Sequence, residues 1–62
     1  MFIFLNDGRK VNMMWVATFY QEKNEVIYEM VKGQTVKVVE SFGTEAEAKA
    51  RIDELEDIYL YH

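Results

Sequence analysis

The sequence lacks cysteine, and it has one serine, Ser41, and one histidine, His62. Without cysteine no disulfide can form, and the remaining residues offer no set of zinc ligands. Nucleophilic catalysis needs a nucleophile, a base and an orienting group, which one serine and a histidine at the last position do not supply. Gly8 and Gly33 lie between strand-like segments, outside any glycine-rich phosphate-binding pattern. We therefore expect no enzyme activity, no metal and no cofactor.

Long hydrophobic runs are also missing. The opening segment, residues 1–5, is apolar, but Asn6-Asp7-Gly8 follows it at once and no basic stretch precedes it. A signal peptide or a membrane-spanning helix needs a longer apolar run. We therefore expect a cytoplasmic protein that has no membrane partner.

The length and the apolar content predict one small folded domain. The chain has 62 residues, of which 50% are hydrophobic and 15% aromatic, and this excludes an intrinsically disordered segment. A single domain over residues 1–62 buries only about 60% of the surface that its unfolded chain exposes. The core is therefore thin, and the extra burial provided by a homodimer is expected.

The net charge of −4 comes from one part of the chain. Residues 1–43 carry as many basic as acidic side chains, whereas residues 44–62 carry two basic and six acidic ones. On a helical wheel the clustered acidic side chains point in different directions, so a hard cation would not find converging oxygens. A solvated helix face explains them, and imitation of nucleic-acid phosphates is the alternative. The candidate acidic surface consists of Asp53, Glu54, Glu56 and Asp57.

The acidic segment is predicted to be a helix that starts at residue 44 or 45. Thr44 and Glu47 have the spacing of a capping box, and Gly43 lets the chain turn into the helix. At about 100° per residue an apolar stripe recurs along one face. The stripe consists of Ala48, Ile52, Leu55, Ile58 and Tyr59. We expect Ile52 and Leu55 to pack on Trp15, Ala17 and Tyr28.

The preceding residues alternate between β-branched or aromatic runs and turn residues. This pattern predicts four strands over about residues 2–5, 9–20, 25–31 and 34–41. The second strand is long, so a bend or bulge is expected near Met13-Met14. The fold class predicted is α+β, a four-stranded antiparallel meander with one C-terminal helix packed on one face (ββββα).

Turn chemistry sets the expected strand registers. A two-residue turn at Asp7-Gly8 would place Phe4 opposite Val11. A polar turn at residues 21–24 and a three-residue loop at 31–33, with Gly33 left-handed, set the other two registers. These would pair Phe19 with Val26, Ala17 with Tyr28, Tyr28 with Val36 and Val26 with Val38.

These registers agree on one buried face, which the helix stripe should cover. Its members are Phe2, Phe4, Val11, Met13, Trp15, Ala17, Phe19, Val26, Tyr28, Met30, Val36 and Val38. The reverse face is too apolar to lie wholly in solvent. The candidate interface on the reverse face consists of Ile3, Met14, Val16, Tyr20, Ile27 and Val39.

The segment from Val39 to Ala48, with Leu55 beyond it, runs from a predicted strand into a capped helix. It resembles the same junction in small uncharacterised bacterial and phage proteins built from a β-meander and one helix. This resemblance implies an architecture and carries over no catalytic or binding residue. The order of four strands and one helix is also similar to that of dimeric single-strand DNA-binding coactivators, although no basic motif of theirs is matched.

Together these patterns favour a small non-enzymatic protein-interaction module that forms a homodimer through the reverse face or a sheet edge. The sequence does not indicate the protein partner or the pathway. A nucleic-acid-related role is the alternative, either single-strand binding by the open sheet face or mimicry by the acidic helix. Because the strand region is neutral overall, nucleic acid is not the expected partner.

Overall fold

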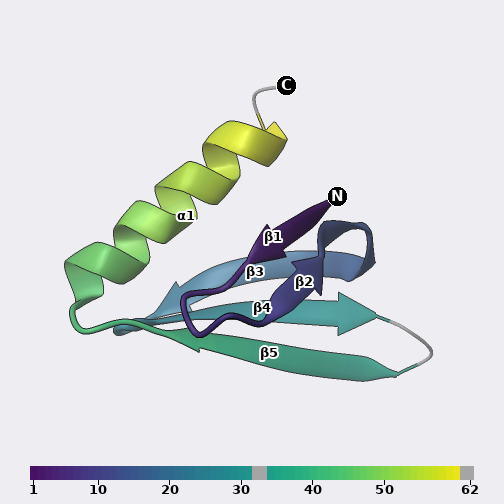
Figure 1. Ribbon diagram of the computed structural model, residues 1–62, viewed down its shortest axis with the longest axis horizontal. Helices are drawn as coiled ribbons and strands as arrows, with labels where there is room; N and C mark the ends of the chain where they lie inside the picture. The colour runs from purple at the N-terminus through teal and green to yellow at the C-terminus, as the bar shows by residue number, and fades with distance from the viewer. Residues whose placement is uncertain (32–33, 61–62) are drawn as a thin grey trace.

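The computed structural model describes residues 1–31 and 34–60, and it confirms an α+β fold with antiparallel strands and one C-terminal helix (Figure 1). The strands form a two-stranded and a three-stranded sheet, so the expectation of one four-stranded meander is wrong. The elements are β1 (Phe2–Phe4), β2 (Lys10–Asn12), a 3-10 turn (Met13–Trp15), β3 (Val16–Glu22), β4 (Glu25–Val31), β5 (Thr35–Ser41) and α1 (Glu45–Leu60).

The predicted single sheet does not form, because the chain leaves the extended conformation at Met13–Trp15, where a bend was expected. The Asn12 side chain accepts a hydrogen bond from Met14 N at 3.0 Å, which caps a short 3-10 turn. This turn separates β2 from β3, so β1 and β2 form a hairpin of their own. The predicted second strand, residues 9–20, is therefore two strands that belong to different sheets.

The three-stranded sheet has the order β3-β4-β5, with both neighbouring pairs antiparallel. Tyr28 lies opposite Phe19 on β3 and Val38 on β5, so both expected registers are wrong by two residues. A shift of two keeps every side chain on its face, because side chains along a strand alternate. Phe19, Tyr28 and Val38 consequently share the inner face, as expected. The conformation predicted for Gly33 lies outside the described residues.

The register of the β1–β2 hairpin is wrong by one residue, and this exchanges the two faces of β1. Leu5 N donates to Arg9 O at 2.8 Å, closing a three-residue loop in which Gly8 has φ of 94°. Glycine adopts this conformation without the strain of a Cβ atom. Phe4 therefore lies opposite Lys10 instead of Val11, and Leu5 is buried.

Five residues predicted to be buried are exposed: Phe2, Phe4, Trp15, Ala17 and Val36. A bulge between Val16 and Thr18 leaves Ala17 without a partner on β4 and turns Val16 toward the core. Trp15 lies in the 3-10 turn and is 43% exposed. Val36 lies near the start of β5, at the end of the sheet that α1 does not cover (Figure 1).

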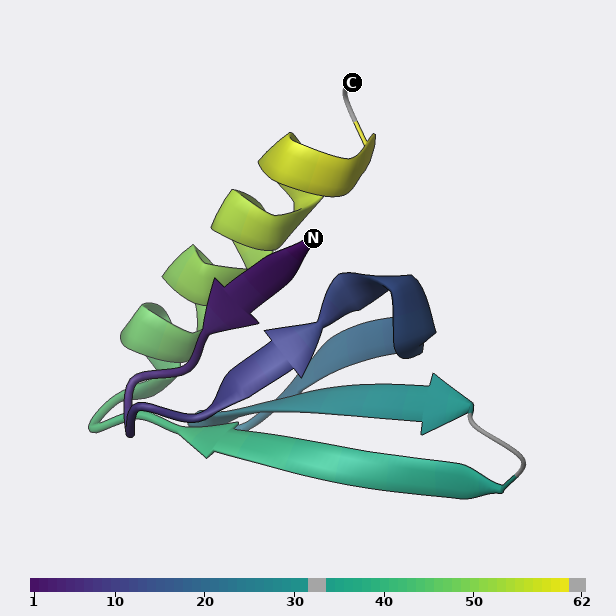
Figure 2. The same cartoon turned by 45° about the vertical axis from the view of Figure 1, so that its right-hand side comes forward.

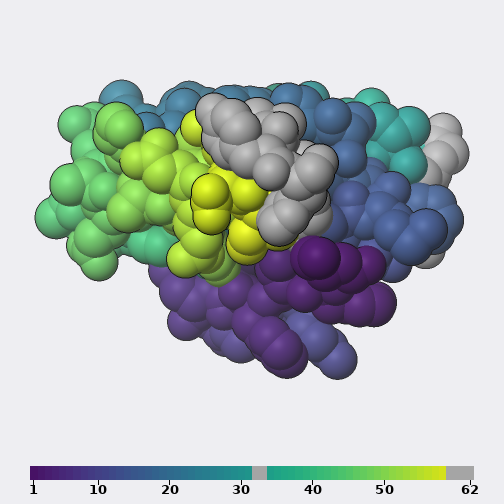
Figure 3. All heavy atoms as spheres, turned by 90° about the horizontal axis from the view of Figure 1, so that it is seen from above, coloured from purple at the N-terminus to yellow at the C-terminus, as the bar shows by residue number. Residues whose placement is uncertain are grey.

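The core lies between the sheet on one side and α1 with the hairpin on the other. Its buried residues are Leu5, Val11, Val26, Tyr28, Ala48 and Leu55. Helix α1 contacts β3 and β4, and the hairpin lies beside the helix (Figures 2 and 3). Ile52 packs against this core as expected, but Trp15 and Ala17 are not part of it.

The N-terminus of α1 confirms the predicted cap. Glu47 N donates to Thr44 Oγ1 at 3.2 Å, and the Thr44 hydroxyl donates to the Glu47 carboxylate at 3.1 Å. The Gln21 side chain also donates to Glu45 O at 3.0 Å, which ties the start of the helix to β3. Cap and tether together fix where the helix leaves the sheet.

Candidate functional site

One of the fully buried side chains of the molecule is a carboxylate, that of Glu40. Glu40 has no exposed surface, and it lies opposite Val26 on the inner face of the sheet. Strand alternation places it there, two residues beyond Val38. A buried charge is costly unless it is paired and hydrogen-bonded, so the surroundings of Glu40 decide whether this position is tolerated.

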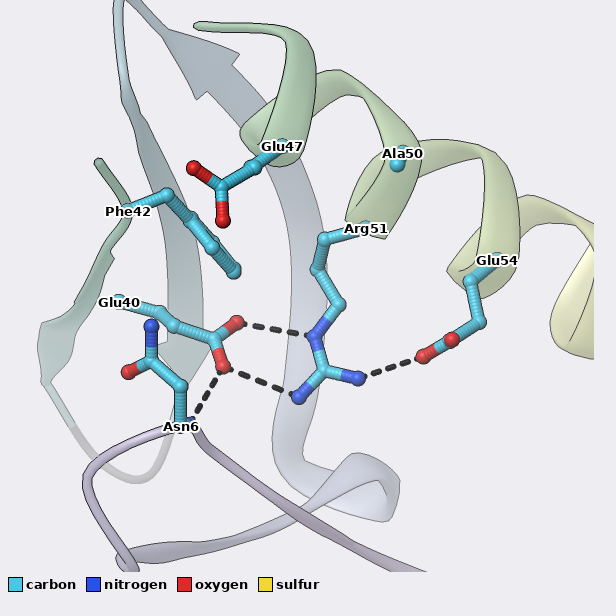
Figure 4. Close-up of a pocket in the computed structure, with 7 residues that line it drawn as sticks. All are labelled: Asn6, Glu40, Phe42, Glu47, Ala50, Arg51 and Glu54. Carbon is cyan, nitrogen blue, oxygen red and sulfur yellow. Dashed lines mark hydrogen bonds and ion pairs between the residues drawn. The ribbon is translucent and has the colours of Figure 1, made fainter. Parts of the chain in front are cut away.

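Each carboxylate oxygen of Glu40 accepts two hydrogen bonds, and Figure 4 shows those from Arg51 and Asn6. Oε1 accepts from the Tyr28 hydroxyl at 2.8 Å and from Arg51 Nε at 3.0 Å. Oε2 accepts from Asn6 N at 2.8 Å and from Arg51 Nη2 at 3.0 Å. The carboxylate is thus satisfied by the hairpin loop, β4 and α1 at once.

Arg51 extends this cluster to the molecular surface. Its Nη2 also donates to Phe4 O at 2.6 Å, and its Nη1 donates to Glu54 Oε1 at 2.5 Å. The side chain of Arg51 is 18% exposed, whereas that of Glu54 is 57% exposed. The guanidinium therefore joins β1, β5 and the next turn of α1 through one planar group.

The hydrogen bonds set the protonation states of the cluster. Burial alone would raise the pKa of Glu40, but the bonds from Arg51, Tyr28 and Asn6 N outweigh it and hold the pKa below its ordinary value. Burial raises the pKa of Tyr28, and the bond to Glu40 raises it further. The bond to Glu40 likewise raises the pKa of Arg51. The Glu40 carboxylate is therefore anionic, the Tyr28 phenol neutral and the Arg51 guanidinium cationic.

Such a cluster suits a structural role better than proton transfer. A catalytic acid or base needs a pKa near the working pH and access to the substrate. Glu40 has neither, because its pKa is lowered and its side chain is buried. We therefore assign Glu40, Arg51 and Tyr28 to fastening the hairpin and the helix onto the sheet.

An open groove runs along the exposed edge of this cluster, between α1 and the hairpin loop (Figure 4). It has a volume of about 400 Å³. Asn6, Glu40 and Phe42 form one side, and residues of α1 form the other. The residues that line it are Asn6, Glu40, Phe42, Glu47, Ala50, Arg51 and Glu54.

The outer face of the hairpin is aromatic. The relative exposure of Phe2 is 60% and that of Phe4 is 68%, because the register of β1 turns both outward. Lys10 lies opposite Phe4, and its Nζ is 6.0 Å from the centroid of the Phe2 ring. Two exposed rings at alternate positions of one strand, with a cation beside them, make this face a candidate binding surface.

The candidate interface expected on the reverse face is divided among three places. Tyr20, Ile27 and Val39 form one cross-strand row on the uncovered face of the sheet. Met14 is 80% exposed in the 3-10 turn. Ile3 and Val16 instead pack against the core.

The uncovered face of the sheet carries polar contacts as well as this row. The Tyr20 hydroxyl donates to Glu29 Oε2 at 2.9 Å, and Lys37 Nζ is 3.7 Å from the same oxygen. The bond to Glu29 raises the pKa of Tyr20. Ile27 is buried even though it faces away from the helix. Polar groups on this face thus pair with one another, and part of its apolar surface is already buried. The face exposes less apolar surface than the sequence suggested.

The four acidic residues of the candidate acidic surface do not act as one group. Lys49 Nζ pairs with Asp53 at 3.2 Å, and Arg51 pairs with Glu54. Glu56 is half-buried and Asp57 is exposed. Among the described residues, no group of three or more His, Cys, Asp or Glu side chains is placed to hold a metal ion.

The sequence interpretation missed Glu40, Arg51 and Asn6. The available signal was the alternation Val36, Val38, Glu40, which puts a carboxylate on the inner face and requires a buried partner. Asn6 gave no such signal, because its contact depends on how the hairpin folds over β5.

Comparison with protein-family models, curated proteins and solved structures gives no match for this chain. No helix in the described part of the chain is both long enough and apolar enough to cross a membrane. Function is therefore inferred from the surfaces of the molecule itself.

Proposed function

We propose that the protein is a non-enzymatic interaction module that forms a homodimer through the outer face of its N-terminal hairpin. The observation that carries this proposal is the exposure of Phe2 and Phe4, at 60% and 68%, on a rigidly fastened strand. Small soluble domains seldom leave two neighbouring aromatic rings in solvent, since their burial against a partner is favourable.

The neighbourhood of these rings supplies further apolar surface. Met13 N donates to Met1 O at 2.8 Å, which brings the 3-10 turn beside the start of β1. Met1 and Met14 are both exposed there. A stable interface needs about 600–800 Å² from each partner, so the two rings require these neighbours to reach it.

The face is also suited to pairing with its own copy. A two-fold dimer brings the same patch together from both subunits, so each copy offers Lys10 and receives the rings of the other. A lysine over an aromatic ring is attractive, and Lys10 already lies 6.0 Å from the Phe2 ring centroid within one chain.

The proposal is tested by sedimentation of the wild type and of Phe2→Ser/Phe4→Ser at about 10–500 µM, a range that detects weak dimers. The wild type should shift from monomer to dimer, and the double variant should remain a monomer with unchanged circular dichroism. Val31→Ser/Val36→Ser is the matched control, since both valines are exposed elsewhere. A wild type that sediments only as a monomer, or a serine variant that still dimerises, contradicts the proposal.

Single-stranded nucleic acid is the second candidate occupant of the same face. Bases stack on aromatic rings beside basic side chains, and Phe2, Phe4 and Lys10 have this arrangement. Arg9, however, is paired with Asp7 at 2.6 Å, so little positive charge is left for phosphates. A labelled oligonucleotide titrated at low salt tests this role, which predicts binding that weakens as salt rises.

Mimicry of nucleic acid by α1 is less well supported than either role. Asp53 and Glu54 are paired with cations of the same chain, which leaves few helix carboxylates to imitate a row of phosphates.

A further inference from the structure

The groove between α1 and the hairpin loop has apolar walls beneath an acidic rim (Figure 4). The ring of Phe42 forms one wall and is half-buried. Ala50 lines the groove from α1, and its small side chain leaves the space open. Such walls suit the hydrocarbon part of a ligand.

The rim carries two carboxylates with acceptor capacity to spare. Glu47 Oε1 accepts from the Thr44 hydroxyl, and Glu54 Oε1 accepts from Arg51 Nη1. No hydrogen bond to the second oxygen of either group is made within the described part of the chain. The two residues are seven positions apart on the helix, so their backbones are about 10 Å apart along its axis.

The groove is negatively charged overall. The lining holds three carboxylates, those of Glu40, Glu47 and Glu54, and one cation, Arg51, which pairs with both Glu40 and Glu54. A ligand that fits must therefore be a cation. A bare metal ion is not indicated, because in the described part of the chain no three His, Cys, Asp or Glu side chains are placed to hold one.

We propose that this groove binds an arginine side chain of a partner protein, with its stem along Ala50 and its guanidinium between the Phe42 ring and the rim carboxylates. A planar guanidinium stacks on an aromatic ring, and its several donors reach acceptors on different sides, which a compact ammonium group does less well. The site lies on a different surface from the outer face of the hairpin, so neither proposal depends on the other.

The test uses N-acetyl-arginine methylamide as the probe, titrated into isotopically labelled protein and followed by amide chemical shifts. Saturable shifts are expected at Asn6, Phe42 and residues 47–54. The neutral citrulline derivative should cause none of them, and the lysine derivative should bind more weakly than arginine. Shifts that fail to saturate, or that the citrulline derivative reproduces, overturn the proposal.

Variants locate the binding. Glu47→Gln/Glu54→Gln should weaken it at least tenfold, whereas Asp53→Asn/Asp57→Asn, with the same change of charge on another face of α1, should leave it unchanged. Ala50→Lys places a cation in the groove and should abolish binding, which provides an independent check should the double glutamine variant fold poorly. An equal loss of binding in the two double variants would mean that the probe is attracted to the acidic helix in general, and this would overturn the proposed site.

Discussion

The carboxylate of Glu40 and the guanidinium of Arg51 form a two-point ion pair, with Nε to Oε1 and Nη2 to Oε2 both at 3.0 Å. One partner comes from the last strand and the other from the middle of the helix. Asn6 N and the Tyr28 hydroxyl also donate hydrogen bonds to the Glu40 carboxylate. It therefore joins every layer of this small molecule.

Arg51→Met should lower the free energy of unfolding by about 3–5 kcal/mol, because it leaves the buried Glu40 carboxylate without its cation. Glu40→Gln/Arg51→Met should recover most of this loss, since an amide still accepts from Tyr28 without carrying charge. Urea unfolding of the wild type, both single variants and the double variant measures the coupling. A stabilising osmolyte in all samples keeps the weakest variant folded. A loss below about 1 kcal/mol for Arg51→Met would contradict the assignment.

Acid should destabilise the protein through the same carboxylate. The pKa of Glu40 is held below its ordinary value of 4.5 in the folded state, so the unfolded chain binds a proton first as the pH falls. The stabilisation is fully present above pH 4.5 and is lost as the pH falls through the folded-state pKa. Unfolding free energies measured between about pH 7 and pH 3 should decline more steeply for the wild type than for Glu40→Gln/Arg51→Met. Parallel curves would refute this role.

Leu55→Ala should cost about 2–4 kcal/mol, because it opens a cavity where a fully buried side chain meets Tyr28 and Ala48 in the core. The loss should be visible as a much lower midpoint in thermal melting followed by circular dichroism. Val31→Ala, at an exposed position, is the control and should melt close to the wild type. A Leu55→Ala variant that melts within a degree or two of the wild type would mean that the helix packs differently.

Gly8→Ala should destabilise the hairpin by about 1 kcal/mol or more, since a φ of 94° strains any residue with a Cβ atom. Gly43→Ala is the comparison, because there the added Cβ would meet the end of the Glu47 side chain at 3.2 Å and not backbone. Hydrogen exchange of the Leu5 amide, which bonds to Arg9 O across the loop, reports the effect locally. Equal exchange in Gly8→Ala and the wild type would argue against the three-residue loop.

Changing Asp53, Glu54, Glu56 and Asp57 together to their amides should alter the free energy of unfolding by less than about 1 kcal/mol. Exposed ion pairs contribute little, and the mutual repulsion of the four groups is relieved. Chemical denaturation at low and high salt checks this, and the difference between the two salts should shrink in the variant. A large loss of stability would contradict this prediction, because it would mean that these side chains help to hold the fold together.

The helix could be predicted from the sequence because its signals are local. Thr44 and Glu47 specify the cap within one turn, and the spacing of Ala48, Ile52 and Leu55 specifies the buried face. The inner faces of β4 and β5 were also predictable, since alternation fixes which side chains share a face even when the register shifts by two.

The hairpin could not be predicted with the same success. The sequence Asp7-Gly8 is compatible with a two-residue or a three-residue loop, and the choice exchanges the faces of β1. The choice made by the fold depends on distant contacts, such as Asn6 N on Glu40 and Phe4 O on Arg51, that no local pattern reveals. The exposure of Phe2 and Phe4 was missed for this reason, whereas the burial of Glu40 could have been found from the alternation along β5.

The bond from Arg51 to Phe4 O spans 47 positions of a 62-residue chain, which has a consequence for synthesis on the ribosome. The hairpin emerges before the helix, and the side chain that holds it against β5, Arg51, is made 47 positions after Phe4. The core that contains Leu5 and Val11 therefore cannot close until the helix has left the exit tunnel. Any pause in translation before residue 51 would therefore prolong the interval in which this nascent segment is open to chaperones, proteases and neighbouring chains.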